Sequence, residues 1–291
     1  MLRIAVVGAN GQLGRAVVRK FQANGQALVI PLIRSEIDVT RREIVDRALS
    51  SLECDVVVNT SAAHGKDAET ALEHTFAVNT LGPKYLADHC GRRSIDFVHI
   101  STDYVFRGDQ RYPYRESDCC QPVKAYGCSK LAGEHLIRSA TERWYIVRVS
   151  GLYGVGGCRA KGNSNFVDMV LERGQRDKQL AVVDDQWITP TYVVDVAETL
   201  LRLIQTRKYD IYHMTNSGAC SWYEFACEVV RQARLDAQVN PIKTAASNAP
   251  FPRQAYSVLD NYNLRSIGVP DLRSWTAALA AYLEERRSLL G

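Results

Sequence analysis

The sequence predicts an α/β fold in which helices cover both faces of a doubly wound parallel sheet, joined by a smaller mixed α/β portion. Up to Ser150, short apolar segments alternate with helical patterns, as is typical of such sheets. Past Ser150 the pattern becomes irregular, starting with five glycines between Gly151 and Asn165. We therefore predict a first domain over residues 1–150 and a second portion over residues 151–291, with a return of residues 186–215 to the main sheet.

Composition and charge limit the partners that the protein can have. The 291 residues carry a net charge of +4, and their Lys and Arg residues are scattered, so a nucleic-acid partner is not expected. The first residues lack a signal-peptide pattern, and no apolar run approaches the roughly 18 residues of a membrane span. None of the eight cysteines belongs to a C-x-x-C pair. We expect a cytoplasmic protein with reduced thiols, no membrane partner and no bound metal.

A glycine-rich turn follows the first strand-like segment, Leu2–Val7, and an apolar helical pattern follows the turn. The glycines have the spacing G-x-x-G-x-x-G. A backbone without Cβ turns tightly and approaches a pyrophosphate closely, while the N-terminus of the next helix offers free N–H groups. In this context the turn predicts that residues 1–150 are a Rossmann domain that binds NAD(P), with contacts from Gly8, Asn10, Gly11, Gln12 and Leu13.

The end of the second strand-like segment, Ala27–Leu32, indicates which cofactor is bound. An NAD site commonly has an acidic side chain near this point, whereas an arginine accommodates the 2′-phosphate of NADP. Arg34 therefore favours NADPH, although NADH stays possible because acidic residues follow closely. An ordinary surface arginine is the alternative interpretation. The cofactor contacts predicted in this region are Arg34, Asp38 and Val39.

Two further strand-like segments end in small or polar residues, and ligands of open α/β sheets bind at the carboxyl ends of strands. After Asp55–Asn59, the cofactor contacts predicted are Ala62, Ala63 and His64. After Phe97–Ile100 come Ser101, predicted to contact the cofactor, and Thr102, whose hydroxyl could bond a substrate oxygen. A simple turn or capping hydroxyl is the alternative for Thr102.

Tyr126 and Lys130 are spaced to act as a proton donor and its cation. Residues four apart on a helix have Cβ atoms about 5–6 Å apart, so the ammonium can lie beside the phenol. A nearby cation favours phenolate and lowers the pKa of a tyrosine toward the range useful for general acid catalysis. A chance pair on a solvated helix face is the alternative, because the chain contains 14 tyrosines.

Other patterns place the remaining elements. Two capping boxes, Thr40-x-x-Glu43 and Ser221-x-x-Glu224, predict helix starts. Helical patterns are also predicted over Ala77–Cys90, Val193–Ile204 and Ser274–Leu289, and a strand over Gln179–Asp184.

Three motifs taken together resemble the extended short-chain dehydrogenase/reductase family, and within it the dTDP-4-dehydrorhamnose reductase branch. They are the glycine turn, the run from Ser101 to Phe106, and Tyr126-x-x-x-Lys130. The resemblance extends through Asp185–Thr191 and covers most of the chain. It implies a Rossmann-fold reductase that uses NADPH to reduce a 4-keto nucleotide-diphosphate deoxysugar.

The resemblance also implies roles for individual residues. Thr102, Tyr126 and Lys130 would be catalytic: Thr102 polarises the carbonyl, Tyr126 donates the proton, and Lys130 lowers the pKa of Tyr126. Tyr126 and Lys130 would also hold the cofactor. The second portion, residues 151–291, would bind the substrate, and the substrate contacts are predicted to be Thr102, Asp103, Asn165, Trp187 and Arg253, the last through the diphosphate.

Two other functions stay open. One is a non-catalytic NADP-binding regulatory subunit; for either function, the oligomeric state that we expect is a homodimer. The other is a nucleotide-sugar epimerase or dehydratase of the same fold. Dehydratases resembling this chain carry a further acid/base carboxylate after the threonine, where this chain has Asp103-Tyr104. The phenol of Tyr104 cannot replace a second carboxylate, so the sequence favours the reductase.

Overall fold

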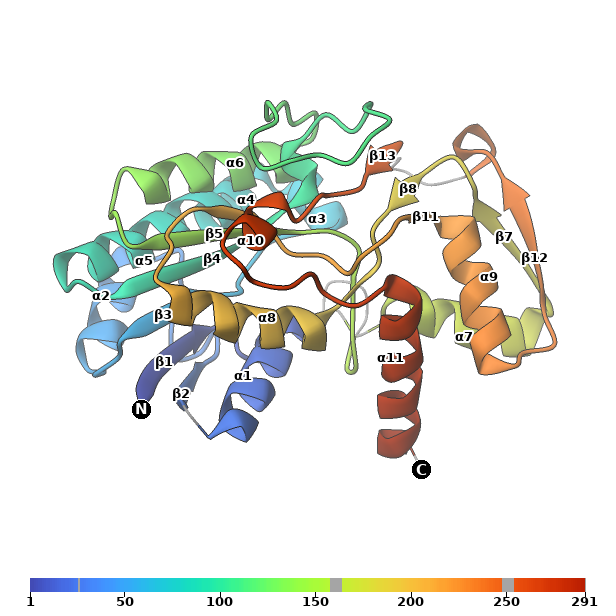
Figure 1. The fold of residues 1–291 in the computed structure, drawn as a ribbon. Helices are drawn as coiled ribbons and strands as arrows, with labels where there is room; N and C mark the ends of the chain where they lie inside the picture. Colours follow the sequence, from blue (N-terminus) through green and yellow to red (C-terminus); the bar gives the residue numbers. More distant parts are fainter. Residues whose placement is uncertain (26, 158–163, 248–253, 291) are drawn as a thin grey trace.

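Six parallel strands form the central sheet in a computed structural model that describes residues 1–25, 27–157, 164–247 and 254–290 (Figure 1). The strands lie in the order β10-β5-β4-β3-β1-β2. The chain runs outward in opposite directions from β1 and β3, so the switch point where such folds bind ligands lies between these strands. The strands are β1 Leu2–Val7, β2 Ala27–Leu32, β3 Val56–Asn59, β4 Asp96–Thr102, β5 Trp144–Val149 and β10 Ile211–His213.

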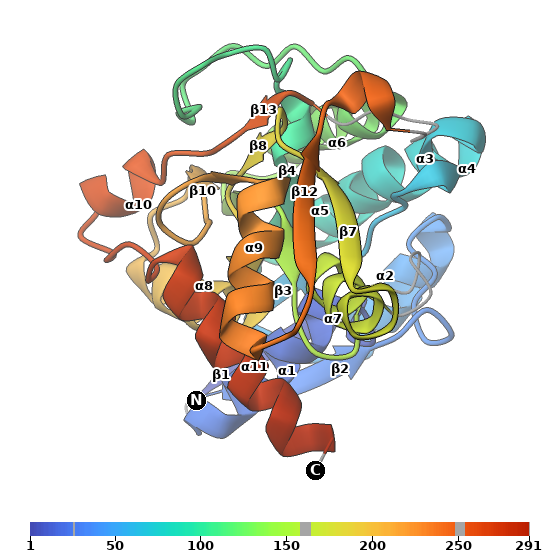
Figure 2. The same ribbon diagram turned by 90° about the vertical axis from the view of Figure 1, so that its right-hand side faces the viewer.

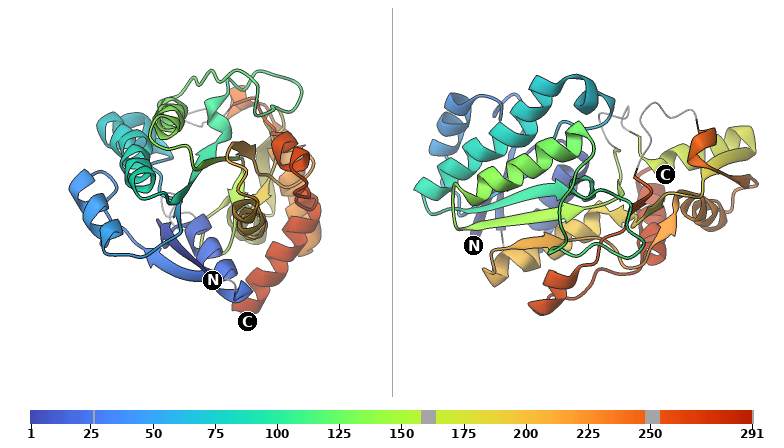
Figure 3. Two further views of the ribbon diagram at one scale, coloured as in Figure 1. Left: turned by 60° about the vertical axis from the view of Figure 1, so that its left-hand side comes forward. Right: turned by 90° about the horizontal axis from the view of Figure 1, so that it is seen from above.

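Helices cover both faces of the sheet, as Figures 1 and 3 show. In β1, Ile4 and Val6 belong to the core under α1 and α8, whereas Ala5 and Val7 belong to the core under α2 and α5. Among the described residues, none of the helices combines the length and apolar character that a membrane crossing requires. The helices against the sheet are α1 Gln12–Asn24, α2 Arg42–Ser50, α5 Gly82–Arg92, α6 Ala125–Arg138 and α8 Val193–Thr206.

A smaller mixed portion lies beyond one end of the sheet (Figure 1) and faces the viewer in Figure 2. In this portion β7 (Gln179–Val183) pairs with β12 (Gln238–Ile242), and β8 (Trp187–Ile188) lies between two other short strands. Its other elements are α7 Phe166–Asp177, β11 Cys220–Ser221, α9 Trp222–Ala233, a 3-10 turn at Thr244–Ala246, β13 Tyr256–Ser257 and α11 Trp275–Leu290. The short helix α10 Tyr262–Ser266 lies against β10 of the main sheet instead. The strand pair β6 (Leu152–Tyr153) and β9 (Thr191–Tyr192) joins this portion to the sheet.

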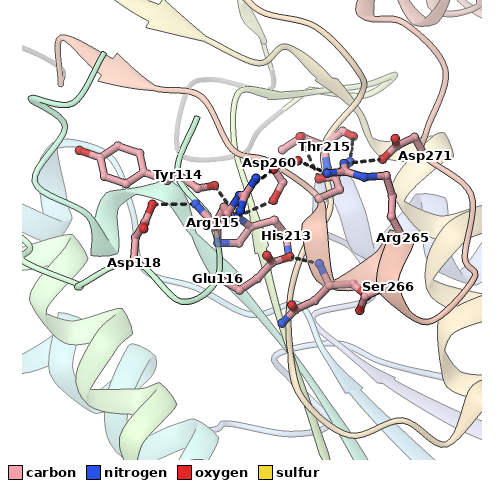
Figure 4. Close-up of polar contacts among 12 residues, drawn as sticks. Tyr114, Arg115, Glu116, Asp118, His213, Thr215, Asp260, Arg265, Ser266 and Asp271 are labelled. Atoms are coloured by element: carbon pink, nitrogen blue, oxygen red, sulfur yellow. Dashed lines mark hydrogen bonds and ion pairs between the residues drawn. The ribbon is translucent and has the colours of Figure 1, made fainter. Parts of the chain in front are cut away.

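The edge strand β10 is held in the sheet by segments that precede and follow it in the chain (Figure 4). The backbone N–H of His213 donates to Glu116 Oε1 at 2.9 Å, and its Nδ1 donates to the carbonyl oxygens of Tyr114 and Asp260 at 3.0 and 3.1 Å. Arg265 pairs with Asp260 at 2.6 Å. Residues after 150 therefore contribute the strand β10 to the main sheet and the helix α8 to its cover. The division into two domains at residue 150 stays a prediction.

The predicted parallel sheet is confirmed, and two of the predicted helical segments begin elsewhere than expected. The capping box at Ser221 is present. The capping box at Thr40 is absent, because the Thr40 hydroxyl donates to Asp38 Oδ1 at 2.8 Å and α2 begins only after Arg41. The helical segment predicted from Ala77 also begins earlier, with the short turns α3 Lys66–Thr70 and α4 Leu72–Phe76 and the π-helical turn η1 Ala77–Leu81 before α5.

Candidate active site

A cavity of about 990 Å³ opens at the carboxyl ends of the central strands. The segments that follow β1, β2, β3, β4 and β5 all contribute to its lining. This is the position that the rule for open α/β sheets predicts. The cavity extends to the smaller portion, so one space is shared by the two parts of the fold.

The glycine turn after β1 packs closely against the backbone of the segment after β3. Gly8 has φ +79°, and a Cβ there would lie 2.9 Å from the nitrogen of Ser61. A Cβ on Gly14 would lie 2.2 Å from the carbonyl oxygen of Gly8. Larger residues cannot occupy these positions without moving the turn. The turn leaves the N-terminus of α1 facing the cavity without a side-chain cap, which suits a pyrophosphate.

The loop after β2 presents a cation to the cavity. Arg34 is exposed and lines the cavity. The carboxylate of Glu36 is turned back and accepts from its own loop at Ile33 N, at 2.8 Å. Asp38 accepts from the backbone and hydroxyl of Thr40. Arg34 is thus placed to bind a phosphate group, and the residues present fit an NADP.

The end of β4 places a hydroxyl and a carboxyl side by side. Thr102 Oγ1 donates to Asp103 Oδ1 at 2.8 Å and accepts from the backbone N–H of Tyr104 at 3.2 Å. Ser150 Oγ donates to the other carboxylate oxygen of Asp103 at 3.0 Å. Burial raises the pKa of Asp103 to about 6, although the hydrogen bond from Thr102 opposes the shift. Asp103 can therefore gain or lose a proton close to neutral pH.

Tyr126 lies in the first turn of α6 and lines the same cavity, with its ring edge-on to that of Tyr104 at 5.7 Å. Glu69 fixes this end of the helix, because its carboxylate accepts from the backbone N–H groups of Ala125 and Tyr126 at 3.1 and 3.2 Å. Further along α6, Glu134 forms a buried ion pair with Arg148 of β5 at 2.7 Å. The helix that carries Tyr126 is held at both ends.

Lys130 is buried below the cavity lining rather than in it. It is 1% exposed, and its Nζ contacts His99 Nε2 at 2.8 Å and the carbonyl oxygen of Ile100 at 2.6 Å. Burial lowers the pKa of Lys130 to about 7, although the nearby carboxylate of Glu134 opposes this shift. The amino group of Lys130, expected beside the phenol of Tyr126, is thus directed to β4 in this structure.

Aromatic side chains from the smaller portion close the far side of the cavity. Phe166, Trp222 and Phe225 line it, and the rings of Phe166 and Trp222 are 4.5 Å apart. The sequence analysis did not identify these residues. Their only signal was the spacing of Trp222 and Phe225 on one face of the helix after the Ser221 capping box, which also fits an ordinary core.

Comparisons with known proteins agree with this site. The model of the RmlD substrate binding domain family matches residues 2–288. The chain belongs to this family. The spore coat polysaccharide biosynthesis protein SpsK of Bacillus subtilis (strain 168) is 38% identical over 289 residues, covering 99% of each chain.

Two solved structures of dTDP-4-dehydrorhamnose reductases are similar to this RmlD-family chain. The one from Clostridium acetobutylicum is 35% identical, with a TM-score of 0.93 over 98% of this chain and 100% of the other. The one from Bacillus anthracis, in complex with NADP, is 31% identical, with a TM-score of 0.92 over 98% and 99%. The resemblance drawn from the three motifs is confirmed.

Within the RmlD-family fold, all predicted cofactor residues except Lys130 line the cavity, as do Thr102 and Asp103. Their binding roles stay predictions. Two predicted substrate contacts, Asn165 and Trp187, do not line the cavity, and their roles stay predictions as well. Asn165 is 5% exposed and caps α7. Its Oδ1 accepts from Asp168 N, and its Nδ2 donates to Gly154 O.

Trp187 is the second of these two residues. Its side chain is 39% exposed and is not part of the cavity lining, whereas the next residue in β8, Ile188, does line the cavity. Successive residues of a strand point to opposite sides, so Trp187 points away from the side on which Ile188 lines the cavity. The third predicted contact from the second portion, Arg253, lies outside the described residues.

Proposed function

We propose that this protein is an NADPH-dependent reductase of a 4-keto nucleotide-diphosphate deoxysugar, with Tyr126 as the proton donor. The observation that carries the proposal is that Thr102 and Tyr126 line the same cavity as the glycine turn and Arg34. Reductases of this substrate class among the relatives support it. A nucleotide sugar is then the small-molecule partner, and the cytoplasmic location and the homodimer stay predictions.

The residues of the cavity suit the reduction of a carbonyl group. The glycine turn and Arg34 would hold an NADPH, which supplies the hydride. Charge then develops on the substrate oxygen, and donors already aimed at that oxygen stabilise it without rearrangement. Tyr126 donates its proton to this oxygen, and Thr102 hydrogen-bonds the carbonyl.

Asp103 controls which way the proton of Thr102 points. In the structure the threonine hydroxyl donates to Asp103. When Asp103 takes up a proton, the carboxyl group can donate to Thr102 Oγ1, and the threonine proton is released for a substrate oxygen. The pKa of Asp103, raised by burial to about 6, makes this exchange accessible at moderately acidic pH.

Turnover with a panel of 4-keto nucleotide deoxysugars tests the proposal. We expect NADPH oxidation with at least one member of the panel and a product that carries a hydroxyl at the former keto carbon. Tight NADPH binding without turnover on any substrate would favour a regulatory subunit. Conversion of the sugar without net consumption of NADPH would favour an epimerase or dehydratase.

Replacement of Arg34 should change the cofactor preference. We expect Arg34→Ala to weaken NADPH binding by about tenfold or more, because a charged hydrogen bond contributes roughly 1.5–3 kcal/mol. NADH binding should change little, since NADH lacks the 2′-phosphate. Dissociation constants of both cofactors, measured by fluorescence titration, give the comparison.

Arg41→Ala is the matched control for Arg34. Arg41 is also exposed in this region, but it pairs with Glu43 at 2.7 Å and does not line the cavity. Both dissociation constants should stay at the wild-type values in this variant. Equal losses of NADPH and NADH affinity in Arg34→Ala would show that Arg34 does not recognise the 2′-phosphate.

A further inference from the structure

A line of buried polar side chains runs from β3 through β4 to Lys130. Asn59, His99 and Lys130 are 0%, 0% and 1% exposed. Asn59 Nδ2 lies 3.1 Å from His99 Nδ1, and His99 Nε2 lies 2.8 Å from Lys130 Nζ. Because water does not reach these atoms, each N–H group of these side chains must donate to a neighbouring protein atom.

The orientation of Asn59 is fixed by Ser61. The backbone N–H of Ser61 donates to Asn59 Oδ1 at 3.0 Å, and Ser61 Oγ lies 2.6 Å from the same oxygen. A backbone N–H can only donate, so the oxygen of the amide must face Ser61 and its nitrogen must face His99. An amide nitrogen can only donate as well, so His99 Nδ1 is the acceptor and carries no proton.

The remaining proton of His99 decides the state of Lys130. Burial alone holds the pKa of His99 below its usual value, so the imidazole is neutral even beside an uncharged Lys130. Its one proton is then on Nε2, which points at Lys130 Nζ. An ammonium has no lone pair, so Lys130 can receive this hydrogen bond only as a neutral amine, while it donates one of its own protons to Ile100 O.

We propose that His99, oriented by Asn59, is a positioning residue for Lys130: its Nε2–H bond to the amine lone pair holds Lys130 neutral and directed toward β4. Protonated Lys130 must leave this contact, because two N–H groups would then face each other. His99 thereby sets the pH at which Lys130 becomes a cation able to act on Tyr126, one turn earlier on the same helix. The last step rests on the proposed function.

Several charged groups near α6 are bound to partners other than Lys130. Glu134, on the same helix as Lys130, favours the charged form of the lysine but is itself paired with Arg148 of β5. The π-helical turn η1 contributes Asn79 and Thr80, which bond Ser129 and do not titrate. Of the groups in the turn after β4 and in α3, Asp103 bonds Thr102 and Ser150, Glu69 bonds the helix N-terminus, and Tyr104 contacts the ring of Tyr126. Helix α5 also packs against α6, and there Lys84 pairs with Asp88 while His89 and Arg92 bond Asp46 of α2. Helix α4, which packs against α6 as well, carries Glu73 and His74.

Nuclear magnetic resonance of the full chain tests the proposal without any assay of activity. In ¹⁵N-labelled wild-type protein above neutral pH, we expect His99 to carry its proton on Nε2 and none on Nδ1. A proton on Nδ1 would overturn the proposal, because the hydrogen bond to Lys130 would then run in the other direction. This measurement uses wild-type protein, so its result does not depend on whether a variant folds.

Titration of Lys130 is the second readout. The ¹³Cε resonance of Lys130, identified by its loss in Lys130→Arg, reports the protonation of this side chain. We expect the proton affinity of Lys130 to be at least tenfold lower in wild type than in His99→Gln. A glutamine oxygen can accept from an ammonium, so this variant favours the charged lysine. His89→Gln is the matched control, because His89 is 2% exposed and bonds Asp46 instead. An unchanged titration in His99→Gln would overturn the proposal.

The pH dependence of kcat separates this proposal from the catalytic roles. If Lys130 acts as a cation in reduction, the alkaline limb of the profile should move to higher pH in His99→Gln together with the titration of Lys130. A limb that stays in place while the titration moves would remove Lys130 from the proposed mechanism. The assignment of His99 as its positioning residue would stand in that case.

Discussion

Tyr126→Phe should reduce kcat by about 10³-fold, within the range that one general acid contributes. The variant keeps the ring, its edge-on contact with Tyr104 and the fold of α6, and removes only the hydroxyl group. Binding of NADPH should change no more than a few-fold, because the glycine turn and Arg34 provide most of the predicted contacts. Stopped-flow turnover and fluorescence titration measure the two quantities separately.

Tyr104→Phe decides which of the two neighbouring phenols donates the proton. Both tyrosines line the cavity, and their rings lie 5.7 Å apart. If Tyr126 is the acid, removal of the Tyr104 hydroxyl should have a much smaller effect on kcat. Full activity of Tyr126→Phe, or an equal loss in Tyr104→Phe, would contradict the assignment.

The residues at the strand ends could be predicted because the parallel sheet gathers them. Alternating apolar and helical segments predict such a sheet, and its strands all end at one edge. Gly8, Arg34, Ala62 and Thr102 come from four different strand ends and nevertheless line one cavity. No knowledge of side-chain packing was needed for this part of the site.

The contacts of long or distant side chains could not be predicted in this way. Spacing places Lys130 one turn from Tyr126, but the direction of its four-carbon chain depends on His99, which belongs to another strand. The hydroxyl of Thr40 could either cap α2 or bond Asp38, and the sequence alone does not distinguish these two local hydrogen bonds. The aromatic wall formed by Trp222 and Phe225 depends on how the smaller portion packs against the sheet.

Gly127→Ala should destabilise the protein and lower kcat together. A Cβ at this position would lie 2.1 Å from the carbonyl oxygen of Tyr104 and 3.0 Å from Pro122 Cβ. Alanine favours a helix by about 1 kcal/mol over glycine. The overlap with a backbone oxygen outweighs this gain, since overpacking costs about 1–3 kcal/mol and sometimes more. The free energy of unfolding, measured in urea, should therefore fall.

The loss of activity follows from the place of Gly127 between the two proposed donors. Tyr126 precedes it on α6, and the oxygen that it would strike belongs to the turn directly after Thr102. A methyl group there pushes the helix away from the end of β4, and a displacement of about 1 Å can reduce kcat by roughly 10²-fold. Cys128→Ala is the matched control: it changes the next residue of the helix without adding an atom, so both quantities should stay close to wild type. A Gly127→Ala protein with wild-type stability and kcat would show that α6 does not need this close approach to hold Tyr126 beside Thr102.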